Sequence, residues 1–301
     1  MTQFAGTYTV IITPFSADGN SVNTSALREL VEWQIQQGIH GLIPLGSTGE
    51  FLSLSNDEKT HVAEIVIQQA AGRVPVLIGT GAEDTREVIR LSREAESLGA
   101  DGVMIIPPFY STPTEDECFI HYQSIASAIS IPIMVYNNPA TANLDITPAL
   151  VARLAEIDNV SYIKESTLEI TRVRDIIRLC GDKMAVFGGI LGFESFVEGA
   201  QGWVAVGSNA MPKAFAELYA LSVQKGDIPA ARELYLNLLP VIEFVAGHRY
   251  VAGSKALLNE MGLAVGMPRP PRLPLPAAEY EQAKTLVKTF ALQFENALKP
   301  A

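Results

Sequence analysis

The run Gly102-Val103-Met104-Ile105-Ile106 is followed by an amphipathic stretch at 114–128 and then by Pro132-Ile133-Met134-Val135-Tyr136. Neither apolar run alternates cleanly between polar and apolar residues, which is typical of parallel strands that are buried on both faces. The stretch between them has helical spacing. Residues 102–136 therefore predict a strand–helix–strand unit with two parallel strands.

The same alternation continues on both sides of this unit. Short runs rich in Val and Ile predict strands at 7–13, 41–45, 75–78, 102–106, 132–136, 160–164, 184–187 and 202–206. Helical patterns follow them at 23–37, 55–71, 84–98, 114–128, 147–154, 170–179, 192–198 and 212–223. Ser55 and Glu58 have the spacing of a capping box at the start of the second helix.

Eight strand–helix units predict an α/β protein whose strands close into a (β/α)₈ TIM barrel over residues 1–225. An open doubly wound sheet is the alternative, but that fold usually carries a Gly-rich fingerprint after its first strand, and Thr13-Pro14-Phe15 is not one.

Residues 226–301 predict a C-terminal helical extension of the barrel. Helical patterns lie at 228–246, 254–261 and 277–298, and a Pro-rich segment at 268–276 precedes the last of them. We interpret this segment as a stiff connector between helices. The alternative is a Pro-rich ligand for a partner domain.

Composition limits the partners of the chain. Its 301 residues are 48% hydrophobic, which is enough to bury a large core. With 22 basic and 33 acidic residues the net charge is −11, so nucleic acid and anionic membrane surfaces are repelled. No signal peptide or run of about 20 apolar residues is visible, which predicts a cytoplasmic protein without a membrane segment.

Few residues suit a metal or a disulfide. Cys118 and Cys180 are too few for a disulfide scaffold and have no metal-type spacing, so we interpret them as buried thiols. The four histidines, at 40, 61, 121 and 248, share no spacing, and the acidic residues are scattered. We expect neither a metal nor a cofactor.

Active sites of TIM barrels lie at the C-terminal ends of the strands, so reactive side chains there are informative. Lys164 ends an otherwise apolar run. Burial favours the neutral form of an amine, and a neutral amine can form a Schiff base with a ketone. The alternative is a lysine that marks the exit of the strand into solvent.

Two further strand ends carry suitable groups. Tyr136 ends the preceding strand, where a phenol could shuttle protons for imine formation or could be an ordinary core tyrosine. The turn Gly46-Ser47-Thr48-Gly49 offers backbone N–H groups and two hydroxyls to a carboxylate, although many Gly-flanked loops are plain turns.

These motifs resemble the dihydrodipicolinate synthase/N-acetylneuraminate lyase family. The resemblance rests on GSTGE at 46–50, YNNP at 136–139 and IKES at 163–166, and it extends over nearly the whole chain. It implies a (β/α)₈ barrel, a Schiff-base mechanism without metal, and a homotetramer built as a dimer of dimers.

The resemblance also implies roles for single residues. Lys164 would be the Schiff-base lysine, and Tyr136 the proton donor and acceptor. Ser47 and Thr48 would hold the carboxylate of pyruvate or another 2-oxo acid, with Ser47 also relaying protons. Tyr110 would enter the site of a neighbouring subunit, and the backbone carbonyl of Val204 would contact the substrate.

Two departures from the family pattern concern the second substrate. Synthases of the lysine pathway carry an Arg shortly after the Tyr-Asn turn, where this chain has Thr141. Sialic acid lyases carry acidic residues after the seventh strand, where residues 188–191 are Gly-Gly-Ile-Leu. A bidentate carboxylate clamp is therefore missing at the expected position.

Together these features predict a Schiff-base lyase that acts on a 2-oxo acid. It would form or cleave a carbon–carbon bond at pyruvate, or eliminate water or ammonia from a substituted 2-oxo acid or cyclic imine. One alternative is the lysine-pathway synthase, which condenses pyruvate with aspartate semialdehyde. Another is a non-catalytic barrel that senses a 2-oxo acid. Loss of Lys164 or Tyr136 would indicate a sensor, and both are present.

Overall fold

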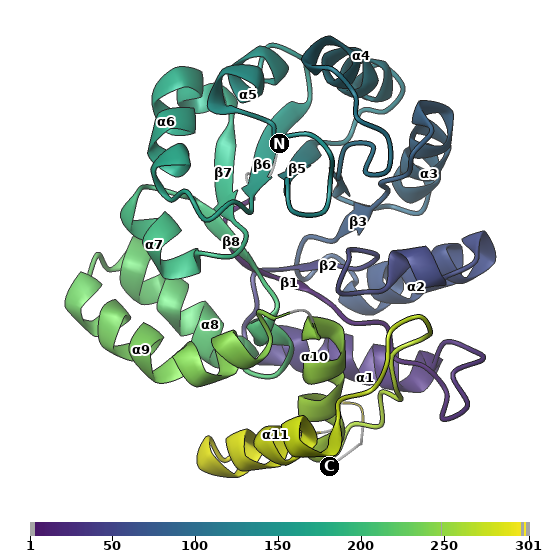
Figure 1. Ribbon diagram of the computed structural model, residues 1–301, viewed down its shortest axis with the longest axis vertical. Helices are drawn as coiled ribbons and strands as arrows, with labels where there is room; N and C mark the ends of the chain where they lie inside the picture. The colour runs from purple at the N-terminus through teal and green to yellow at the C-terminus, as the bar shows by residue number, and fades with distance from the viewer. Residues whose placement is uncertain (1–3, 248, 296–297, 299–301) are drawn as a thin grey trace.

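The computed structural model describes residues 4–247, 249–295 and 298. In this part of the chain eight strands form one parallel sheet (Figure 1): β1 (Gly6–Val10), β2 (Gly41–Ile43), β3 (Leu77–Gly79), β4 (Gly102–Ile105), β5 (Ile133–Asn137), β6 (Val160–Glu165), β7 (Ala185–Gly188) and β8 (Gly202–Ala205). The hydrogen-bonded order is β2-β1-β8-β7-β6-β5-β4-β3. A parallel bridge between Leu42 and Val76 joins β2 to the segment before β3 and closes the barrel, as predicted.

Helices alternate with the strands around the outside of the barrel. They are α1 (Thr24–Gln36), α2 (Asn56–Ala70), α3 (Thr85–Ser97), α4 (Glu115–Ala126), α5 (Pro148–Leu154), α6 (Thr171–Cys180), α7 (Gly192–Val197) and α8 (Pro212–Tyr219). The predicted capping box is present, because the Ser55 hydroxyl accepts from the N–H of Glu58 and the Glu58 carboxylate accepts from the N–H of Ser55.

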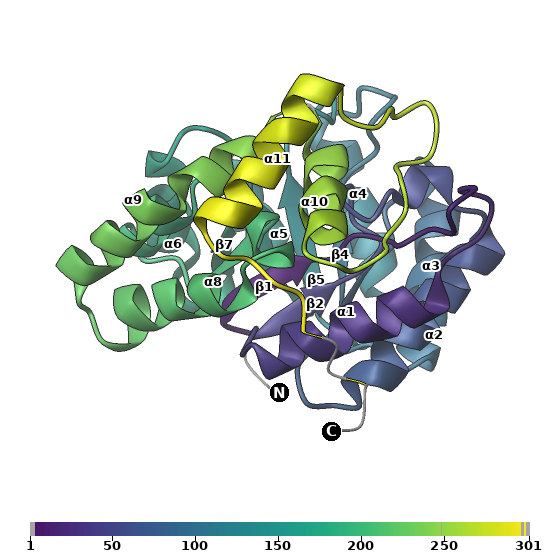
Figure 2. The same ribbon diagram turned by 90° about the horizontal axis from the view of Figure 1, so that it is seen from below.

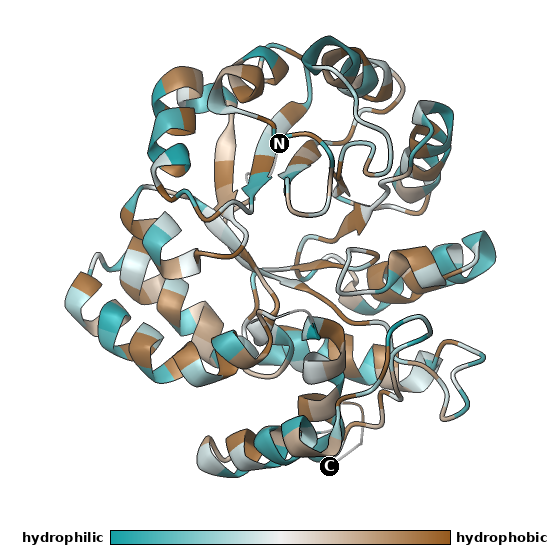
Figure 3. Cartoon of the chain, in the orientation of Figure 1, coloured by the Kyte–Doolittle hydropathy of each residue, from teal (hydrophilic) through white to brown (hydrophobic). Residues whose placement is uncertain are grey.

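The buried residues form two layers, one outside the sheet and one inside the barrel. In Figure 3 hydrophobic residues run along the strands, while the outer helices alternate between hydrophobic and hydrophilic residues. One buried layer lies between the strands and the helices. A second fills the barrel itself, where Phe4, Tyr8, Tyr162 and Phe187 make aromatic contacts with one another. Large aromatic side chains therefore fill this part of the barrel interior.

In the described part of the chain three helices follow the barrel, namely α9 (Ile228–Phe244), α10 (Tyr250–Glu260) and α11 (Ala277–Thr289). Figure 1 shows α10 beside α1, and Figure 2 shows the chain after α11 passing along α1. In that segment the Phe294 ring lies 5.3 Å from the Trp33 ring.

Two predicted helix ends differ by more than two residues in this region. The last helix ends at Thr289 rather than at 298, because Ala291 adopts a left-handed conformation that redirects Phe294 toward Trp33. The preceding helix begins at Tyr250 rather than at 254, and the Ser254 hydroxyl donates to the carbonyl of Tyr250 within its first turn.

The Pro-rich segment is fastened to the barrel, which agrees with its interpretation as a connector. Arg269 forms a bidentate ion pair with Glu58 at 2.6 and 2.9 Å and lies 4.1 Å over the ring of Phe15. The backbone N–H of Arg269 donates to Glu50 at 2.9 Å. The segment thus connects α10 to α11 across the end of the barrel that carries the 46–50 turn.

Candidate active site

Lys164 and Tyr136 occupy adjacent strands at the same level of the barrel. They are register partners of β6 and β5, and Lys164 Nζ lies 3.9 Å from the centre of the Tyr136 ring. The lysine is only 7% exposed. Within the described residues no carboxylate forms an ion pair with it. The amine is therefore held inside the barrel mouth and not at a solvent exit.

The phenol oxygen of Tyr136 has a fixed neighbour. Asn138 Nδ2 donates a hydrogen bond to Tyr136 Oη over 2.9 Å. Because the oxygen accepts from this amide, the phenol hydrogen is free to point elsewhere in the pocket. That orientation suits a group that gives a proton to a bound substrate.

The turn after β2 lies against the same pocket. Ser47 and Thr48 both line it. The Thr13 hydroxyl donates to the carbonyl of Gly49 over 2.7 Å and ties the turn to the end of β1. On either side of the turn Leu45 and Glu50 have left-handed backbone conformations, with φ of 60° and 57°. This tightly constrained backbone presents the two hydroxyls to the barrel mouth.

The side chain of Glu50, the last residue of the 46–50 turn, is held by a buried lysine. Its carboxylate lies 2.7 Å from Lys255 Nζ, and both side chains are almost completely buried. Lys255 also lies 4.0 Å over the Phe15 ring and donates to the carbonyl of Met267. Burial lowers the pKa of Lys255 to about 8, against the opposing charge of Glu50. This ion pair connects the 46–50 turn to the C-terminal extension.

Tyr250, the first residue of α10, is a pocket residue that the sequence analysis missed. Its hydroxyl accepts from Arg272 Nη2 at 3.2 Å, and its side chain lies near Ser47 in the pocket wall. Burial raises the pKa of Tyr250. No local sequence pattern marks it, because the extension must fold back over the barrel before Tyr250 reaches Ser47.

The segment after β7 contributes Gly189 and Ile190 to the pocket wall, which agrees with the apolar character predicted there. Val204, Thr141 and Ile190 all line the pocket, whose volume is about 180 Å³. The Thr141 hydroxyl donates to the carbonyl of Asn138 over 3.3 Å. Arg272 is linked to the pocket through its hydrogen bond to Tyr250, which lines it.

Tyr110 does not belong to the pocket of its own chain. Its side chain is 87% exposed and is absent from the pocket lining. The loop that carries it is nevertheless held firmly, because the Glu83 carboxylate accepts from the N–H groups of Phe109, Tyr110 and Ser111 at 2.8–3.1 Å. Burial raises the pKa of Glu83, but these hydrogen bonds outweigh burial and leave the pKa lowered.

Polar contacts behind the pocket fix the ends of β5 and β6. Asn137 Nδ2 donates to Glu165 over 2.9 Å, and the Asn137 side-chain oxygen accepts from the N–H of Ile146. Arg172 pairs with Asp145 at 2.6 and 2.7 Å and holds the pKa of that carboxyl below its usual range. These contacts face away from the pocket and align the strand that carries Lys164.

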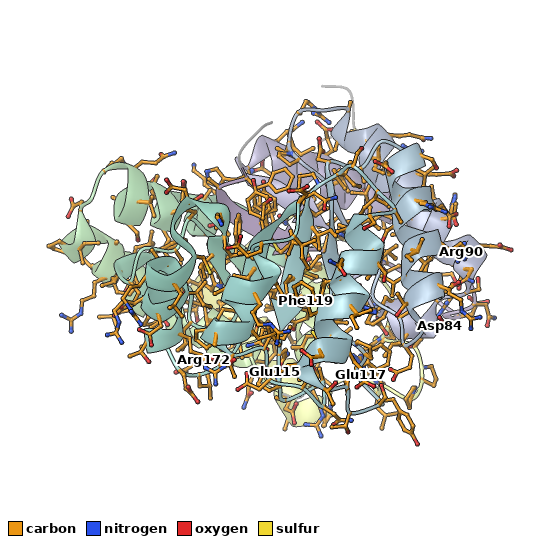
Figure 4. All side chains as sticks on the ribbon, turned by 90° about the horizontal axis from the view of Figure 1, so that it is seen from above. Asp84, Arg90, Glu115, Glu117, Phe119 and Arg172 are labelled. Carbon is orange, nitrogen blue, oxygen red and sulfur yellow. The ribbon has the colours of Figure 1, made fainter. Side chains whose placement is uncertain are left out.

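Figure 4 shows where several of the outer helices begin. Arg172, Glu115, Glu117 and Asp84, from the beginnings of α6, α4 and α3, lie toward one edge of the molecule. Helices of a (β/α)₈ barrel begin where the preceding strands end. The pocket therefore opens at the C-terminal end of the barrel, where the strand-end motifs were predicted to meet.

The two cysteines and the described histidines lie outside the pocket. Cys118 and Cys180 are buried, as predicted, and burial raises the pKa of Cys118 to about 12. His121 is buried, His40 is half-buried and His61 is exposed, whereas His248 lies outside the described residues. Across the described part of the chain no group of three His, Cys, Asp or Glu side chains could hold a metal, and no helix could span a membrane.

Comparison with known proteins gives one consistent family. Residues 3–290 match the model of the dihydrodipicolinate synthetase family. A relative from Trichlorobacter lovleyi is 36% identical over 96% of this chain and all of its own, and one from Syntrophobacter fumaroxidans is 42% identical over 86% and 89%. Both are named 4-hydroxy-tetrahydrodipicolinate synthase.

Solved structures agree with the sequence relatives. The chloride-inhibited dihydrodipicolinate synthase from Acinetobacter baumannii, complexed with pyruvate, has a TM-score of 0.93 and 34% identity over 96% of this chain and all of its own. A prophage protein of the same family from E. coli K12, also complexed with pyruvate, has a TM-score of 0.90 and 30% identity over 97% and 100%.

Proposed function

Because the chain belongs to the dihydrodipicolinate synthetase family and is a lyase of the class I aldolase type, we propose that Lys164 is its Schiff-base residue. The observation that carries this proposal is the buried amine held 3.9 Å from the Tyr136 ring at the mouth of the barrel. The substrate is pyruvate or a substituted 2-oxo acid.

In the first step the neutral amine of Lys164 attacks C2 of the 2-oxo acid. A carbon–nitrogen bond forms, the amine loses two protons, and the carbonyl oxygen leaves as water. Tyr136 supplies a proton to the departing oxygen, and Ser47, which contacts Tyr250, relays protons to the phenol. Thr48 and Ser47 hold the carboxylate, while the carbonyl of Val204 faces the bound acid from β8.

The imine then withdraws electrons from C3. When Tyr136 takes the proton of a C4 hydroxyl, cleavage of the C3–C4 bond leaves an enamine and releases an aldehyde, and the reverse step joins pyruvate to an aldehyde. Loss of a C3 proton followed by departure of a hydroxyl or amino group from C4 gives elimination instead. Each route ends when water restores the ketone and frees Lys164.

The pocket favours a substrate whose portion beyond the pyruvate unit is small and carries no carboxylate. Its volume of about 180 Å³ lies below the usual 300–1,000 Å³ of drug-sized ligand sites. Thr141 cannot make the bidentate hydrogen bonds of a guanidinium. The names of the relatives favour a second candidate, 4-hydroxy-tetrahydrodipicolinate synthase, and in that case Arg272 would have to supply the missing positive charge.

We further propose that the chain is a cytoplasmic homotetramer, built as a dimer of dimers, in which Tyr110 completes a neighbour's site. Its exposed side chain on a firmly held loop supports this assignment. A non-catalytic 2-oxo acid sensor is disfavoured, because it would not need a buried amine beside a phenol.

Borohydride reduction tests the Schiff base directly. The protein incubated with pyruvate and borohydride should gain one reduced adduct, and peptide mapping should place it on Lys164. The internal control is Lys255, which is more deeply buried than Lys164 but is paired with Glu50 outside the pocket. Lys164→Ala should lose both the adduct and turnover. An adduct on Lys255, or full activity of Lys164→Ala, would contradict the proposal.

A further inference from the structure

The conformation of the 46–50 turn depends on its last residue, Glu50. The backbone N–H of Glu50 donates to the carbonyl of Ser47 over 3.2 Å and closes the turn. The φ of Glu50 is 57°, in the left-handed region, which is unfavourable for most residues other than glycine and persists only where the surroundings hold it. Whatever holds Glu50 therefore also fixes the backbone that carries Ser47 and Thr48.

Both oxygens of the Glu50 carboxylate are held by the C-terminal extension. Oε2 accepts from the N–H of Arg269 over 2.9 Å. In the described part of the chain Oε1 makes no hydrogen bond, and its contact is the ammonium of Lys255 at 2.7 Å. A buried carboxylate without a compensating cation is strongly unfavourable. Glu50 is thus stable in this position only while Lys255 carries its charge.

Helix α10 contacts the turn at both ends. Its first residue, Tyr250, lies near Ser47 in the pocket wall, and Lys255 follows on the same helix. Lys255 is 1% exposed, lies 4.0 Å over the Phe15 ring and donates to the carbonyl of Met267. It does not line the pocket, so a bound substrate does not reach it. Any effect of Lys255 on the reaction must therefore pass through the turn.

The opposite side of the turn is packed against the barrel strands. A Cβ atom built on Gly49 would lie 3.1 Å from the carbonyl oxygen of Ile11 and 3.1 Å from the backbone nitrogen of Leu45. The Thr13 hydroxyl also donates to the carbonyl of Gly49. With this side fixed, a displacement of Glu50 would rotate the turn and move its two hydroxyls relative to the barrel mouth.

We propose that the buried Glu50–Lys255 pair positions Ser47 and Thr48 for the carboxylate of the 2-oxo acid, so that the C-terminal extension sets the affinity of the pocket for its substrate. Glu50 and Lys255 are positioning residues, because neither lines the pocket. The inference rests on the proposed function, which makes the turn the carboxylate site. Lys164 is held by a strand, so its chemistry at saturation is independent of the pair.

The variant Glu50→Gln tests the pair, because it removes the charge but keeps the shape and an acceptor for Arg269. The measurement is the pyruvate concentration that half-saturates borohydride trapping on Lys164. It should rise at least tenfold, since each hydrogen bond to a charged carboxylate typically changes affinity by about tenfold or more. The adduct formed at saturation should stay within about threefold of the native amount. A folded Glu50→Gln protein with the native half-saturating concentration would overturn the inference.

The matched control is Glu32→Gln. Glu32 is 8% exposed and forms a bidentate ion pair with Arg73 between α1 and the end of α2, but it does not line the pocket. This variant should leave the half-saturating concentration within about twofold of the native value. A tenfold rise here as well would show that a general loss of stability weakens binding, which would contradict a specific role of the turn.

The double variant Glu50→Gln/Lys255→Met leaves neither residue charged, so it decides the question if Glu50→Gln does not fold. It should show the same rise of at least tenfold in the half-saturating pyruvate concentration at about pH 7. A native value in the folded double variant would overturn the inference.

The pH profile distinguishes positioning by charge from a merely structural contact. Burial lowers the pKa of Lys255 to about 8, opposed by Glu50 and assisted by the charges of Arg269 and Arg272. Above about pH 8 the native pair therefore loses its ammonium, whereas the double variant has no ionisable group at either position. The ratio of the two half-saturating concentrations should fall to about threefold or less near pH 9.5. Lys164 is present in both proteins, so any effect of pH on its amine cancels. A tenfold ratio that stays constant with pH would contradict the role of the charge.

The outcomes also separate this inference from the proposed function. If pyruvate gives no adduct on Lys164 in the native protein, the Schiff-base proposal fails. If pyruvate is trapped on Lys164 with the same half-saturating concentration in the native protein and in the folded variants, only the positioning role of Glu50 and Lys255 is wrong.

Discussion

Lys164 Nζ lies 3.9 Å from the centre of the Tyr136 ring, and the two residues are direct register partners on neighbouring parallel strands. Rigid strands fix this pair more accurately than loops could, and Phe187, the register partner of Lys164 on β7, packs with Tyr162 inside the barrel. The amine therefore has little freedom to leave the phenol. This relationship makes Tyr136 the first residue to test.

Tyr136→Phe should fold normally and slow imine formation by about 10²–10⁴-fold, the usual contribution of a general acid–base group. Rapid-mixing measurements of imine formation with pyruvate would give the rate. Tyr162→Phe is the matched control, because its hydroxyl accepts from the N–H of Phe4 and the residue does not line the pocket. A Tyr136→Phe rate within threefold of the native rate would place the proton path elsewhere.

The sequence allowed the barrel and the Lys164–Tyr136 pair to be predicted because both depend on local patterns. Apolar runs without alternation mark buried parallel strands, and each motif directly follows such a run. Once the units close into a barrel, geometry alone brings the strand ends together. The structure confirms the fold, and it places Ser47, Thr48 and Val204 around the same pocket.

Other features depend on contacts between distant segments and were not predictable. Tyr250 reaches Ser47 only because α10 folds back across the barrel mouth. Glu50 lies inside a quoted motif, but its buried partner Lys255 becomes visible only once α10 is placed against the turn. The early end of α11 depends on the contact between Phe294 and Trp33.

If Tyr110 completes a neighbour's site, two defective variants should restore each other. Lys164→Ala retains its own Tyr110, and Tyr110→Phe retains its own Lys164. Hybrids that form after mixing and reassembly contain sites with both native groups, so activity should rise above the sum of the separate variants. Unmixed samples taken through the same reassembly serve as the control. Activity equal to that sum would show that each chain uses only its own residues.

Breaking the buried pair between Glu50 and Lys255 should destabilise the protein strongly. Lys255→Met leaves an uncompensated carboxylate, which typically costs about 3–5 kcal/mol of unfolding free energy. The double variant Glu50→Gln/Lys255→Met should be clearly more stable than Lys255→Met alone. Chemical denaturation would measure the unfolding free energy of both variants.

The control for this pair is the exposed ion pair between Lys183 and Glu156, where Lys183→Met should change stability by about 1 kcal/mol or less. Equal losses of unfolding free energy in Lys255→Met and Lys183→Met would contradict the prediction that burial makes the Glu50–Lys255 pair more important for stability.

His121 should make stability depend on pH below neutrality. Burial lowers the pKa of His121 from 6.5 to about 4 in the folded protein, despite the opposing charge of Glu83. Between pH 6.5 and 4 the unfolded chain therefore binds a proton that the folded chain does not, so stability falls as pH falls. Below pH 4 both states are protonated and this contribution stops changing.

Urea denaturation between pH 7 and 4 would measure this effect. One proton corresponds to a slope of up to about 1.4 kcal/mol per pH unit. His121→Gln should remove that part of the slope while leaving the contributions of the carboxylates. An identical pH dependence in the native protein and in His121→Gln would contradict the lowered pKa of this histidine.

Thr141 provides the sharpest test of the second substrate. It lines the pocket where a lysine-pathway synthase carries an arginine, and hydrogen bonds to charged groups contribute roughly 1.5–3 kcal/mol each. At about 1.4 kcal/mol per tenfold change, Thr141→Arg should raise kcat/KM for aspartate semialdehyde by about tenfold or more. Thr141→Leu should give no gain, because it changes shape without adding charge. The native protein should remain below about 10⁴ M⁻¹s⁻¹, the lower end for typical enzymes. A native value above that limit that falls in Arg272→Leu would instead identify Arg272, hydrogen-bonded to Tyr250, as the carboxylate-binding cation and the protein as a biosynthetic synthase.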